Sequence, residues 1–364
     1  MQENMDQLRQ RCETQLPVMF SDQDRPWCGQ RLRQELQTIQ TNRQVDAFEE
    51  ADRKVQALRD QGFYCRLYGS GCSSLVSYLM NLSEVDPVQH ALPYERFLET
   101  SSSKLLLQFR FVVHQPTSLE GEATTLIQTE SPNQVVSFQQ SNSPDAIPFW
   151  VTQEVRRTVP DFNLNSIPWD DETAFEVLQS GNVEGISQFH DGTLAQILSD
   201  LKPRSLIDIA AITAIRLQES HEFGIEGEYI RRGSSRGPKN SENWQVDEAL
   251  QETRGMILFQ EQIMLIMNRV ADISLGDAYS FIKTACKRQW EPMATTRELF
   301  LIRAEQNGME ESIARKLIDE LREAATRVVC KSHHLSEAVT TYRAAFLKAH
   351  FPSEFSRALR NIHQ

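Results

Sequence analysis

A glycine–serine turn is the segment of this sequence best suited to hold a phosphate group. Gly69, Ser70 and Gly71 follow the strand-like run FYCRLY and precede SSLVSYLMNL, which predicts a helix. In a strand–turn–helix arrangement the first backbone N–H groups of the helix point outward, and the helix dipole favours an anion. A Gly-Ser-Gly segment is also common as a plain tight turn, so both interpretations stay open on this segment alone.

The cysteines and histidines do not form a recognisable metal site. Six cysteines are scattered without a CxxC pair, which is typical of reduced cytosolic thiols and argues against a disulfide frame or a zinc site. The closest approach to a ligand group is Cys330 with His333 and His334, and it lacks a second pair at zinc-site spacing. We therefore predict no bound metal, no other cofactor and a cytoplasmic protein.

Composition places the chain among ordinary globular proteins. It has 364 residues, 40% hydrophobic and 24% charged, enough for one large core or two to three modest ones. Its net charge of −12 argues against a protein that coats nucleic acid nonspecifically, but a local basic channel remains compatible with an acidic body. No run is long enough to span a membrane, and the N-terminus does not resemble a secretory signal.

Three regions position these residues, and together they predict an α+β fold. Residues 1–99 are mostly helical, with the apolar stripe Leu32, Leu36 and Ile39 and a helix end at Gly62. Residues 100–165 contain the short β-type runs LLLQFRFVV, ATTLIQ and QVVSFQQ, which predict a small mixed sheet.

The third region, residues 166–364, is again helical. Ser274 with Asp277 predicts a capped helix start, Asn307–Gly308 a helix end, and Asp170–Asp171 an N-cap. We expect this region to have its own core, containing the following six residues: Leu178, Ile212, Ile263, Ile266, Leu317 and Phe346.

Longer motifs resemble the alpha subunit of bacterial DNA polymerase III, the C-family replicative polymerase. They are GSGCSSLVSYLMNLSEVDPVQHALPYERFLE, IPWDDETAFEVLQSGNVEGISQF, LKPRSLIDIAAITAIR, RGMILFQEQIMLIMNRVADISLGDA and CKSHHLSEAVTTYRAAFLKAHFPSEF. The resemblance covers about Leu8–Leu98 and Ile167–Leu359 and leaves Thr100–Asn165 unassigned. It implies a nucleotidyltransferase-like palm remnant followed by a fingers domain.

The resemblance also implies that the catalytic carboxylates are missing. The family places two aspartates at alternate positions of a strand, and these positions fall on Leu106 and Gln108 within the acid-free run SSSKLLLQFRF. Two-metal phosphoryl transfer needs hard oxygen ligands, which Leu lacks and a neutral amide replaces poorly. No segment resembles the strand of the family's third aspartate. We therefore expect no catalytic residue, and magnesium binding only if the chain is an active polymerase.

The resemblance further implies a set of nucleotide- or phosphate-binding residues. Besides Gly69, Ser70 and Gly71, these are Arg216, Lys283, Lys287, Arg288, Lys331, Ser332 and His333. The lysines and arginines also fit a solvated helix face, and Ser332 fits a plain N-cap. If the positions bind DNA, the five basic residues among them should converge on one concave face.

Three hypotheses follow. The first is an inactive pseudo-polymerase that acts in DNA replication or repair by binding DNA or a replication partner. The second is an active DNA-directed DNA polymerase with relocated carboxylates, or one completed by another polymerase chain. The third is a structural component that uses the fingers helices as a protein interface. Loss of the carboxylates favours the first over the second.

Overall fold

The computed structural model describes residues 2–98, 107–114, 135–140, 146–186, 192–217, 224–233 and 243–362. The helices of the first half are α1 (Gln2–Met19), α2 (Arg25–Thr41), α3 (Val45–Asp60), α4 (Leu75–Leu79), α5 (Ile147–Arg156) and α6 (Glu172–Gln179). The helices that follow are α7 (Gly192–Leu201), α8 (Leu206–Leu217), α9 (Ile225–Arg231), α10 (Trp244–Leu250), α11 (Gln260–Ala271), α12 (Leu275–Cys286), α13 (Trp290–Gln306), α14 (Glu311–Ala325), α15 (Lys331–His350) and α16 (Pro352–Ile362). Among these residues no helix is long and apolar enough to cross a membrane.

The strands form the predicted small mixed sheet. They are β1 (Tyr64–Tyr68), β2 (Phe109–His114) and β3 (Val136–Gln140). β1 runs antiparallel to β2, and β3 runs parallel to β2. The predicted α+β class is therefore confirmed, and so is the strand within LLLQFRFVV, whereas the run ATTLIQ lies outside the described residues.

One face of the sheet packs against α3. Phe109 and Phe111 point to this face and are fully buried. The Phe109 ring meets the Phe48 ring of α3 edge to face, with centroids 5.0 Å apart, and the Phe97 ring at 5.1 Å. Strand alternation explains the arrangement, because every second residue of β2 faces the same side.

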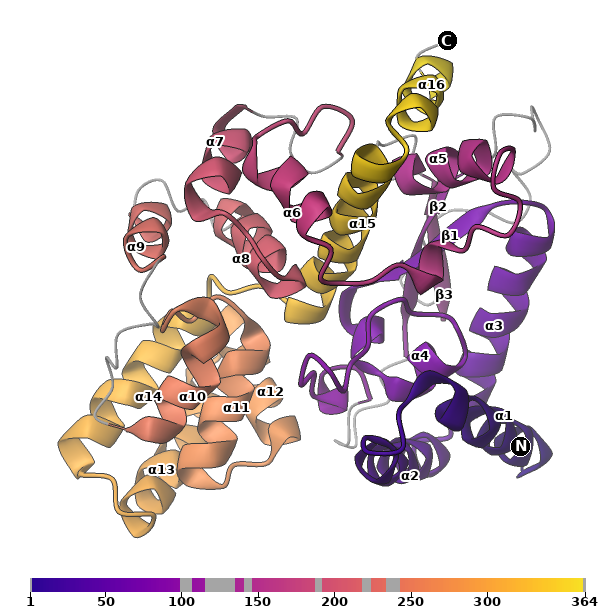
Figure 1. Cartoon of the computed structure of the whole chain (residues 1–364). Coiled ribbons are helices and arrows are strands. Elements are labelled where there is room, and N and C mark those ends of the chain that lie inside the picture. The colour runs from indigo at the N-terminus through magenta and orange to yellow at the C-terminus, as the bar shows by residue number, and fades with distance from the viewer. Residues whose placement is uncertain are drawn as a thin grey trace.

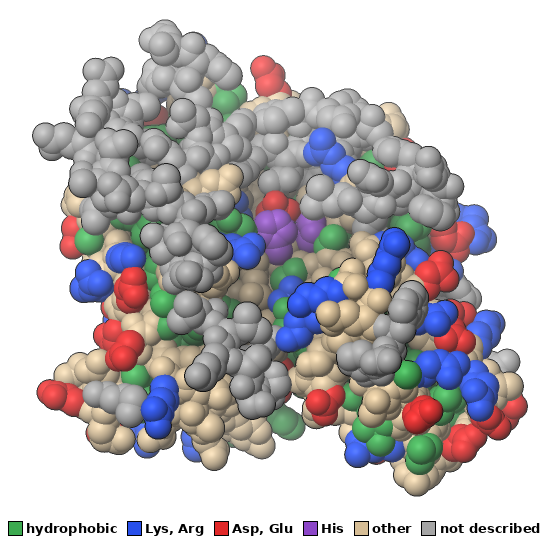
Figure 2. All heavy atoms as spheres, turned by 180° about the vertical axis from the view of Figure 1, so that it is seen from behind, with side chains coloured by type: hydrophobic (Ala, Val, Ile, Leu, Met, Phe, Trp, Pro, Cys, Tyr) green, Lys and Arg blue, Asp and Glu red, His purple; other side chains and the backbone are tan. Residues whose placement is uncertain are grey.

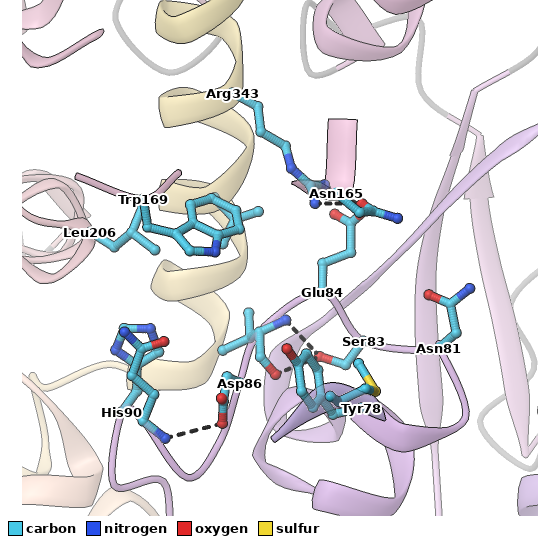
Figure 3. A pocket seen from close by; sticks show the side chains of 14 residues that line it. Tyr78, Asn81, Ser83, Glu84, Asp86, His90, Asn165, Trp169, Leu206 and Arg343 are labelled. Atoms are coloured by element: carbon cyan, nitrogen blue, oxygen red, sulfur yellow. Dashed lines mark hydrogen bonds and ion pairs between the residues drawn. The ribbon is translucent and has the colours of Figure 1, made fainter. Parts of the chain in front are cut away.

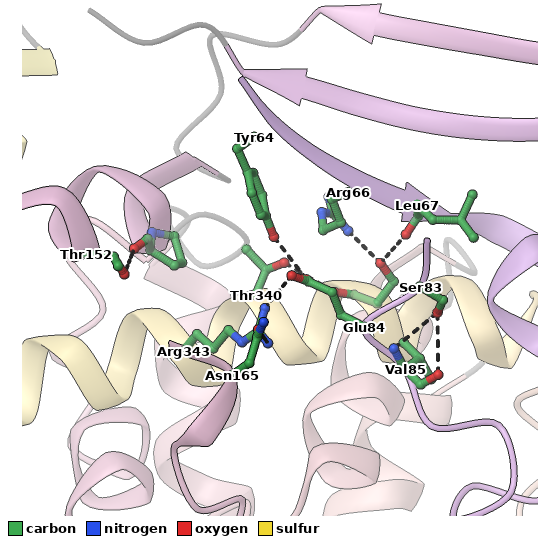
Figure 4. A network of polar contacts seen from close by, with 12 residues as sticks. Tyr64, Arg66, Leu67, Ser83, Glu84, Val85, Thr152, Asn165, Thr340 and Arg343 are labelled. Atoms are coloured by element: carbon green, nitrogen blue, oxygen red, sulfur yellow. Dashed lines mark hydrogen bonds and ion pairs between the residues drawn. The ribbon is translucent and has the colours of Figure 1, made fainter. Parts of the chain in front are cut away.

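The other face of the sheet meets α15, the long helix at the centre of the molecule (Figure 1). Arg66 of β1 donates from Nη1 to Ser336 Oγ at 2.9 Å, and Ser336 Oγ donates to the Leu67 carbonyl at 2.9 Å. The carboxylate of Glu84 accepts a hydrogen bond from Tyr64 Oη of β1 and forms an ion pair with Arg343 of α15, as Figure 4 shows. α6 and α8 pack on α15 as well. α15 therefore joins the sheet to the helical layer.

The hydrophobic core is divided differently from the prediction. Leu178, Ile212 and Phe346 belong to a large cluster that also contains the sheet and α1–α3, whereas Ile263, Ile266 and Leu317 belong to a second cluster formed by α10–α14. The single fingers core that we predicted is therefore wrong. The physical reason is that α15 is buried on several sides. It packs against β1 and also against α6 and α8, so these helices share one hydrophobic cluster with the sheet.

Most predicted helix ends are confirmed. Ser274 Oγ accepts from the Asp277 N–H at 3.1 Å, and Asp171 Oδ1 accepts from the Ala174 N–H at 2.8 Å. Gly62 and Gly308 follow α3 and α13 with φ of 85° and 88°, a left-handed conformation that glycine adopts without a steric penalty.

Candidate functional site

The Gly69–Gly71 segment connects strand and helix as predicted, but through an extra turn. Residues Gly69–Ser73 form a short 3₁₀ helix before α4 begins at Leu75. Gly69 has φ of 78°, and a Cβ on Gly71 would lie only 3.2 Å from Leu67, so both positions favour glycine. The Gly69 carbonyl accepts a hydrogen bond from Ser332 Oγ of α15 at 2.9 Å. The turn is therefore packed into the fold.

The N–H groups at the start of α4 already hold an anion of the protein itself. The carboxylate of Glu35, which is fully buried, accepts from the N–H groups of Leu75 at 3.0 Å and Val76 at 3.2 Å and from Ser74 Oγ at 2.7 Å. Arg31 Nε donates to the same carboxylate at 2.6 Å. Glu35 therefore satisfies these two N–H groups of α4, so they are not available to a phosphate, and phosphate binding by Gly69, Ser70 and Gly71 themselves stays a prediction.

The sheet face beside this turn carries neutral and basic side chains. Gln108 lies just before β2 and is partly buried, while Leu106 lies outside the described residues. Arg110, two residues further on, is exposed and pairs in register with Tyr68. The Tyr68 ring meets the His333 ring edge to face, with centroids 5.7 Å apart. The position expected for a metal-binding carboxylate thus holds an amide.

Carboxylates near this face have partners within the fold. Glu261 of α11 accepts from the N–H groups of Lys331 at 2.7 Å and Ser332 at 3.3 Å, so it caps α15. Glu337 contacts both His333 and His334, at 3.4 and 3.3 Å. Burial acts to raise the pKa of Glu337, but these two histidines hold it below its usual range. Within the ranges that the structure describes, no three His, Cys, Asp or Glu side chains gather as metal ligands would.

Lys331 and Ser332 are placed differently from the phosphate-binding prediction. Lys331 is 2% exposed, and its Nζ lies 2.7 Å from Glu252 Oε1 and donates to the His90 carbonyl at 2.8 Å. Ser332 is buried inside the first turn of α15, so the alternative that it is the N-cap is wrong as well. Both side chains hold elements of the fold together, which removes them from the set of available phosphate ligands.

Three of the other four predicted lysine and arginine positions are exposed. Lys287 and Arg288 are exposed at the C-terminal end of α12, and Arg216 is exposed near the end of α8. Lys283 is partly buried, with its Nζ 4.7 Å from the centre of the Tyr279 ring. Seen from behind, the molecule has a hollow near its centre, with histidine side chains in it and Lys and Arg side chains on both flanks (Figure 2).

The sequence did not single out the residues that dock the second cluster onto the first. Arg96 donates from Nη1 to Tyr279 Oη at 2.7 Å and from Nε to Gln260 Oε1 at 3.1 Å. Its guanidinium also lies 4.5 Å from the centre of the Tyr279 ring. Arg96 was noted only as part of the motif ERFL, and its partners are more than 160 positions away, so no local pattern reveals the contact.

A prediction on pH follows from His90. Burial and the nearby positive charge of Lys331 lower the pKa of His90 to about 4. In the unfolded chain His90 takes up a proton below about pH 6.5, so the unfolded state binds more protons between these values. The free energy of unfolding should therefore fall as the pH is lowered from about 6.5 to about 4. Denaturant titrations across this window should show a shallower fall for His90→Gln, and an unchanged slope would contradict the assignment.

Comparison with known proteins agrees with the resemblance. A family model described as the bacterial DNA polymerase III alpha NTPase domain matches residues 6–105. A second model, the bacterial DNA polymerase III alpha subunit finger domain, matches residues 146–308. The finger match begins at the start of α5 and so includes part of the region that the sequence left unassigned.

Curated relatives carry the same name. The chain is 35% identical over 210 residues to DNA polymerase III subunit alpha of Deinococcus radiodurans. The aligned segment covers 56% of this chain and 16% of that protein. It is 33% identical over 221 residues to the Thermus aquaticus subunit, with 58% and 18% covered. It is 29% identical over 205 residues to the Escherichia coli K12 subunit, with 55% and 18% covered.

The chain thus spans less than a fifth of the length of each of these relatives. Two domain models of this one subunit, the NTPase domain and the finger domain, nevertheless match separate parts of the chain, residues 6–105 and 146–308. The chain is a bacterial DNA polymerase III alpha-like protein that corresponds to a part of that subunit.

Proposed function

We propose that this protein is a catalytically inactive polymerase III alpha-like protein that acts in DNA replication or repair by binding DNA. A replication protein or another polymerase chain is a further partner. The resemblance carries the proposal: it assigns one of the family's metal-binding aspartates to position 108, and the residue there is Gln108, just before β2. An amide oxygen carries no net charge and is a weak ligand for magnesium, which prefers carboxylates.

The neighbouring acids support the same proposal. Glu35 and Glu261 are fully buried, and each satisfies N–H groups at the start of a helix. Moving either carboxylate to a metal would leave those buried donors without acceptors, at a cost of about 1–3 kcal/mol for each group. Two-metal catalysis needs carboxylates that bridge the cations in the resting site, and these two are committed to the fold.

The alternative is an active or partner-completed DNA-directed DNA polymerase. It is favoured by the names of the relatives, each of which is a DNA polymerase III subunit alpha. It requires carboxylates supplied by another chain or by a part of this chain other than the acids placed above. The purely structural hypothesis becomes the leading one if DNA does not bind.

The proposed DNA surface is the exposed basic C-terminal end of α12. Arg216, near the end of α8, is a second proposed phosphate contact. Lys287 and Arg288 stand free of the core, and Lys283 lies one turn before Lys287 on the same helix. Such a group can contact the phosphate backbone although the whole chain carries −12, because the local field depends on nearby charges. Backbone contacts carry no base information, so we expect little dependence on base sequence.

Fluorescence titration of a labelled primer–template at increasing salt tests this surface. Each duplex phosphate contact contributes about −0.9 to the slope of log K against log salt, so Lys283→Ala with Lys287→Ala should make the slope shallower by about one to two units. Lys316→Ala, which removes an exposed lysine from α14, serves as the matched control and should leave the slope unchanged. Absent binding at low salt, or equal slopes in all three proteins, would refute the DNA surface.

A further inference from the structure

Helix α13 carries apolar side chains on two faces. Met293, Phe300 and Ala304 are buried in the second cluster. Leu299 and Ile302 lie on the other face and are 36% and 54% exposed. Residues three apart lie side by side on a helix, so these two form one apolar strip. α13 lies at the outer edge of the unit formed by α10–α14 (Figure 1), where the strip faces solvent.

Two charged side chains flank this strip, one on each side. Glu298 is exposed just before Leu299, and Arg303 is half-buried just after Ile302. Arg303 Nη1 donates to the Asp272 carbonyl at 2.8 Å, which leaves its other N–H groups for a carboxylate. Within the described ranges neither charge has an ion-pair partner. The order acid, apolar, apolar, base is that of positions g, a, d and e in a coiled-coil helix.

The charges in the cavity beside α15 show the contrast (Figure 3). There Glu84 is paired with Arg343, and Asp86 accepts from the N–H groups of Val88 at 2.8 Å and Gln89 at 3.0 Å. The fold thus provides partners for these carboxylates of the cavity wall, whereas the two charges that flank the strip on α13 depend on a partner from outside.

We propose that α13 is the interface between two copies of this chain, packed as parallel helices about a two-fold axis along the helix. Leu299 and Ile302 then each pack against the same residue of the second copy, as a and d residues do. Glu298 meets Arg303 of the second copy, and the symmetry makes the same pair twice. An antiparallel pair would instead place Glu298 beside Glu298, so the charges favour the parallel arrangement.

The strip is short, which limits the affinity. On the same face it ends at the polar residues Thr295 and Gln306, both exposed. Interfaces that bury less than about 1,200 Å² are typical of weak or transient contacts. We therefore expect a reversible equilibrium between monomer and dimer that shifts with protein concentration.

Sedimentation equilibrium of the whole chain at increasing concentration tests the interface. The parent should dimerise reversibly, and Ile302→Glu should stay monomeric, because its charge would be buried against its own copy. Val18→Glu is the matched control, since Val18 is an apolar residue of α1 that is 76% exposed, and it should dimerise as the parent does. So should Lys283→Ala with Lys287→Ala, which makes the result independent of DNA binding. A monomeric parent, or a dimer that Ile302→Glu leaves intact, would overturn the proposal.

Charge reversal tests the orientation. Glu298→Arg places an arginine opposite Arg303 in both pairs, so the dissociation constant should rise by about tenfold. A mixture of Glu298→Arg with Arg303→Glu restores both pairs in the mixed dimer, which should form more tightly than either variant forms with itself. Arg33→Glu, the same reversal on the exposed side of α2, should leave the dissociation constant unchanged. An equal dissociation constant for Glu298→Arg and the parent would contradict the parallel arrangement.

A disulfide tests the pairing directly. In a parallel pair Ile302 meets Ile302 of the second copy within reach of a disulfide, whereas in an antiparallel pair it meets Leu299. Because Cys286 is exposed, Cys286→Ser is combined with each variant. Ile302→Cys should give a disulfide-linked dimer on oxidation, and Arg33→Cys should not. A chain that dimerises without this crosslink would overturn the pairing of α13 with its own copy.

Discussion

Replacing Glu35 with alanine is expected to lower the free energy of unfolding by about 3–5 kcal/mol, the range for breaking a buried ion pair. Glu35 is fully buried, and its carboxylate accepts from Arg31, Ser74, Leu75 and Val76. Removing it leaves Arg31 without its counter-charge and two N–H groups of α4 without acceptors. Urea denaturation followed by circular dichroism measures the change.

Glu50→Ala is the matched control for that experiment. Glu50 also pairs with a basic residue one helical turn away, since Lys54 Nζ lies 2.6 Å from its carboxylate, but the Glu50 side chain is 34% exposed. Exposed pairs of this kind contribute about 0.3–0.5 kcal/mol, so the variant should unfold almost as the parent protein does. If the two variants lose equal stability, Glu35 is not the buried anchor described above.

The second large effect is expected at Glu261. Glu261 is in α11, a helix of the second cluster, and its carboxylate accepts from the Lys331 and Ser332 N–H groups at the start of α15. Glu261→Ala therefore leaves these two N–H groups without their acceptor and also removes a contact between the two clusters. We expect a loss of about 3 kcal/mol, from two unsatisfied buried donors and a lost charge at a helix N-terminus. Denaturant titration gives the total, and amide hydrogen exchange at the start of α15 shows where protection is lost.

Glu261→Gln tests the hydrogen bonds of the cap separately from the charge of the carboxylate. Glutamine keeps one acceptor oxygen, so it should lose less than half as much stability as alanine and retain part of the protection at Ser332. Unchanged exchange at the start of α15 in Glu261→Ala would contradict the capping role, whatever the total stability.

Local patterns predicted the elements well. The turn after β1, the cap at Ser274 and the helix end at Gly62 depend on neighbouring residues, and the structure has them where expected. The β2 strand was predicted from the short β-type run LLLQFRFVV, and its Phe109 and Phe111 are buried on one face of the sheet. Each of these predictions rests on backbone geometry and side-chain periodicity within a few residues.

Contacts between distant segments were not predictable in this way. Glu35 lies 39 positions before Ser74, and Lys331 lies 79 positions after Glu252, so their pairing depends on how whole helices pack. The resemblance implied that Lys331 binds phosphate. The sequence alone does not show whether a lysine faces solvent or, as here, pairs with a carboxylate inside the fold. The division of the core likewise depends on α15, which follows the second cluster in sequence but packs in the first.

Single-turnover primer extension tests the central claim most directly. The purified chain is incubated with a labelled primer–template, all four deoxynucleotides and magnesium or manganese, with the Escherichia coli subunit as the positive control. We predict no extension by the chain and none by Gln108→Asp, because one restored carboxylate does not complete a two-metal site. Templated incorporation that disappears when an acidic residue within positions 1–165 is replaced would contradict the claim and establish the chain as an active polymerase.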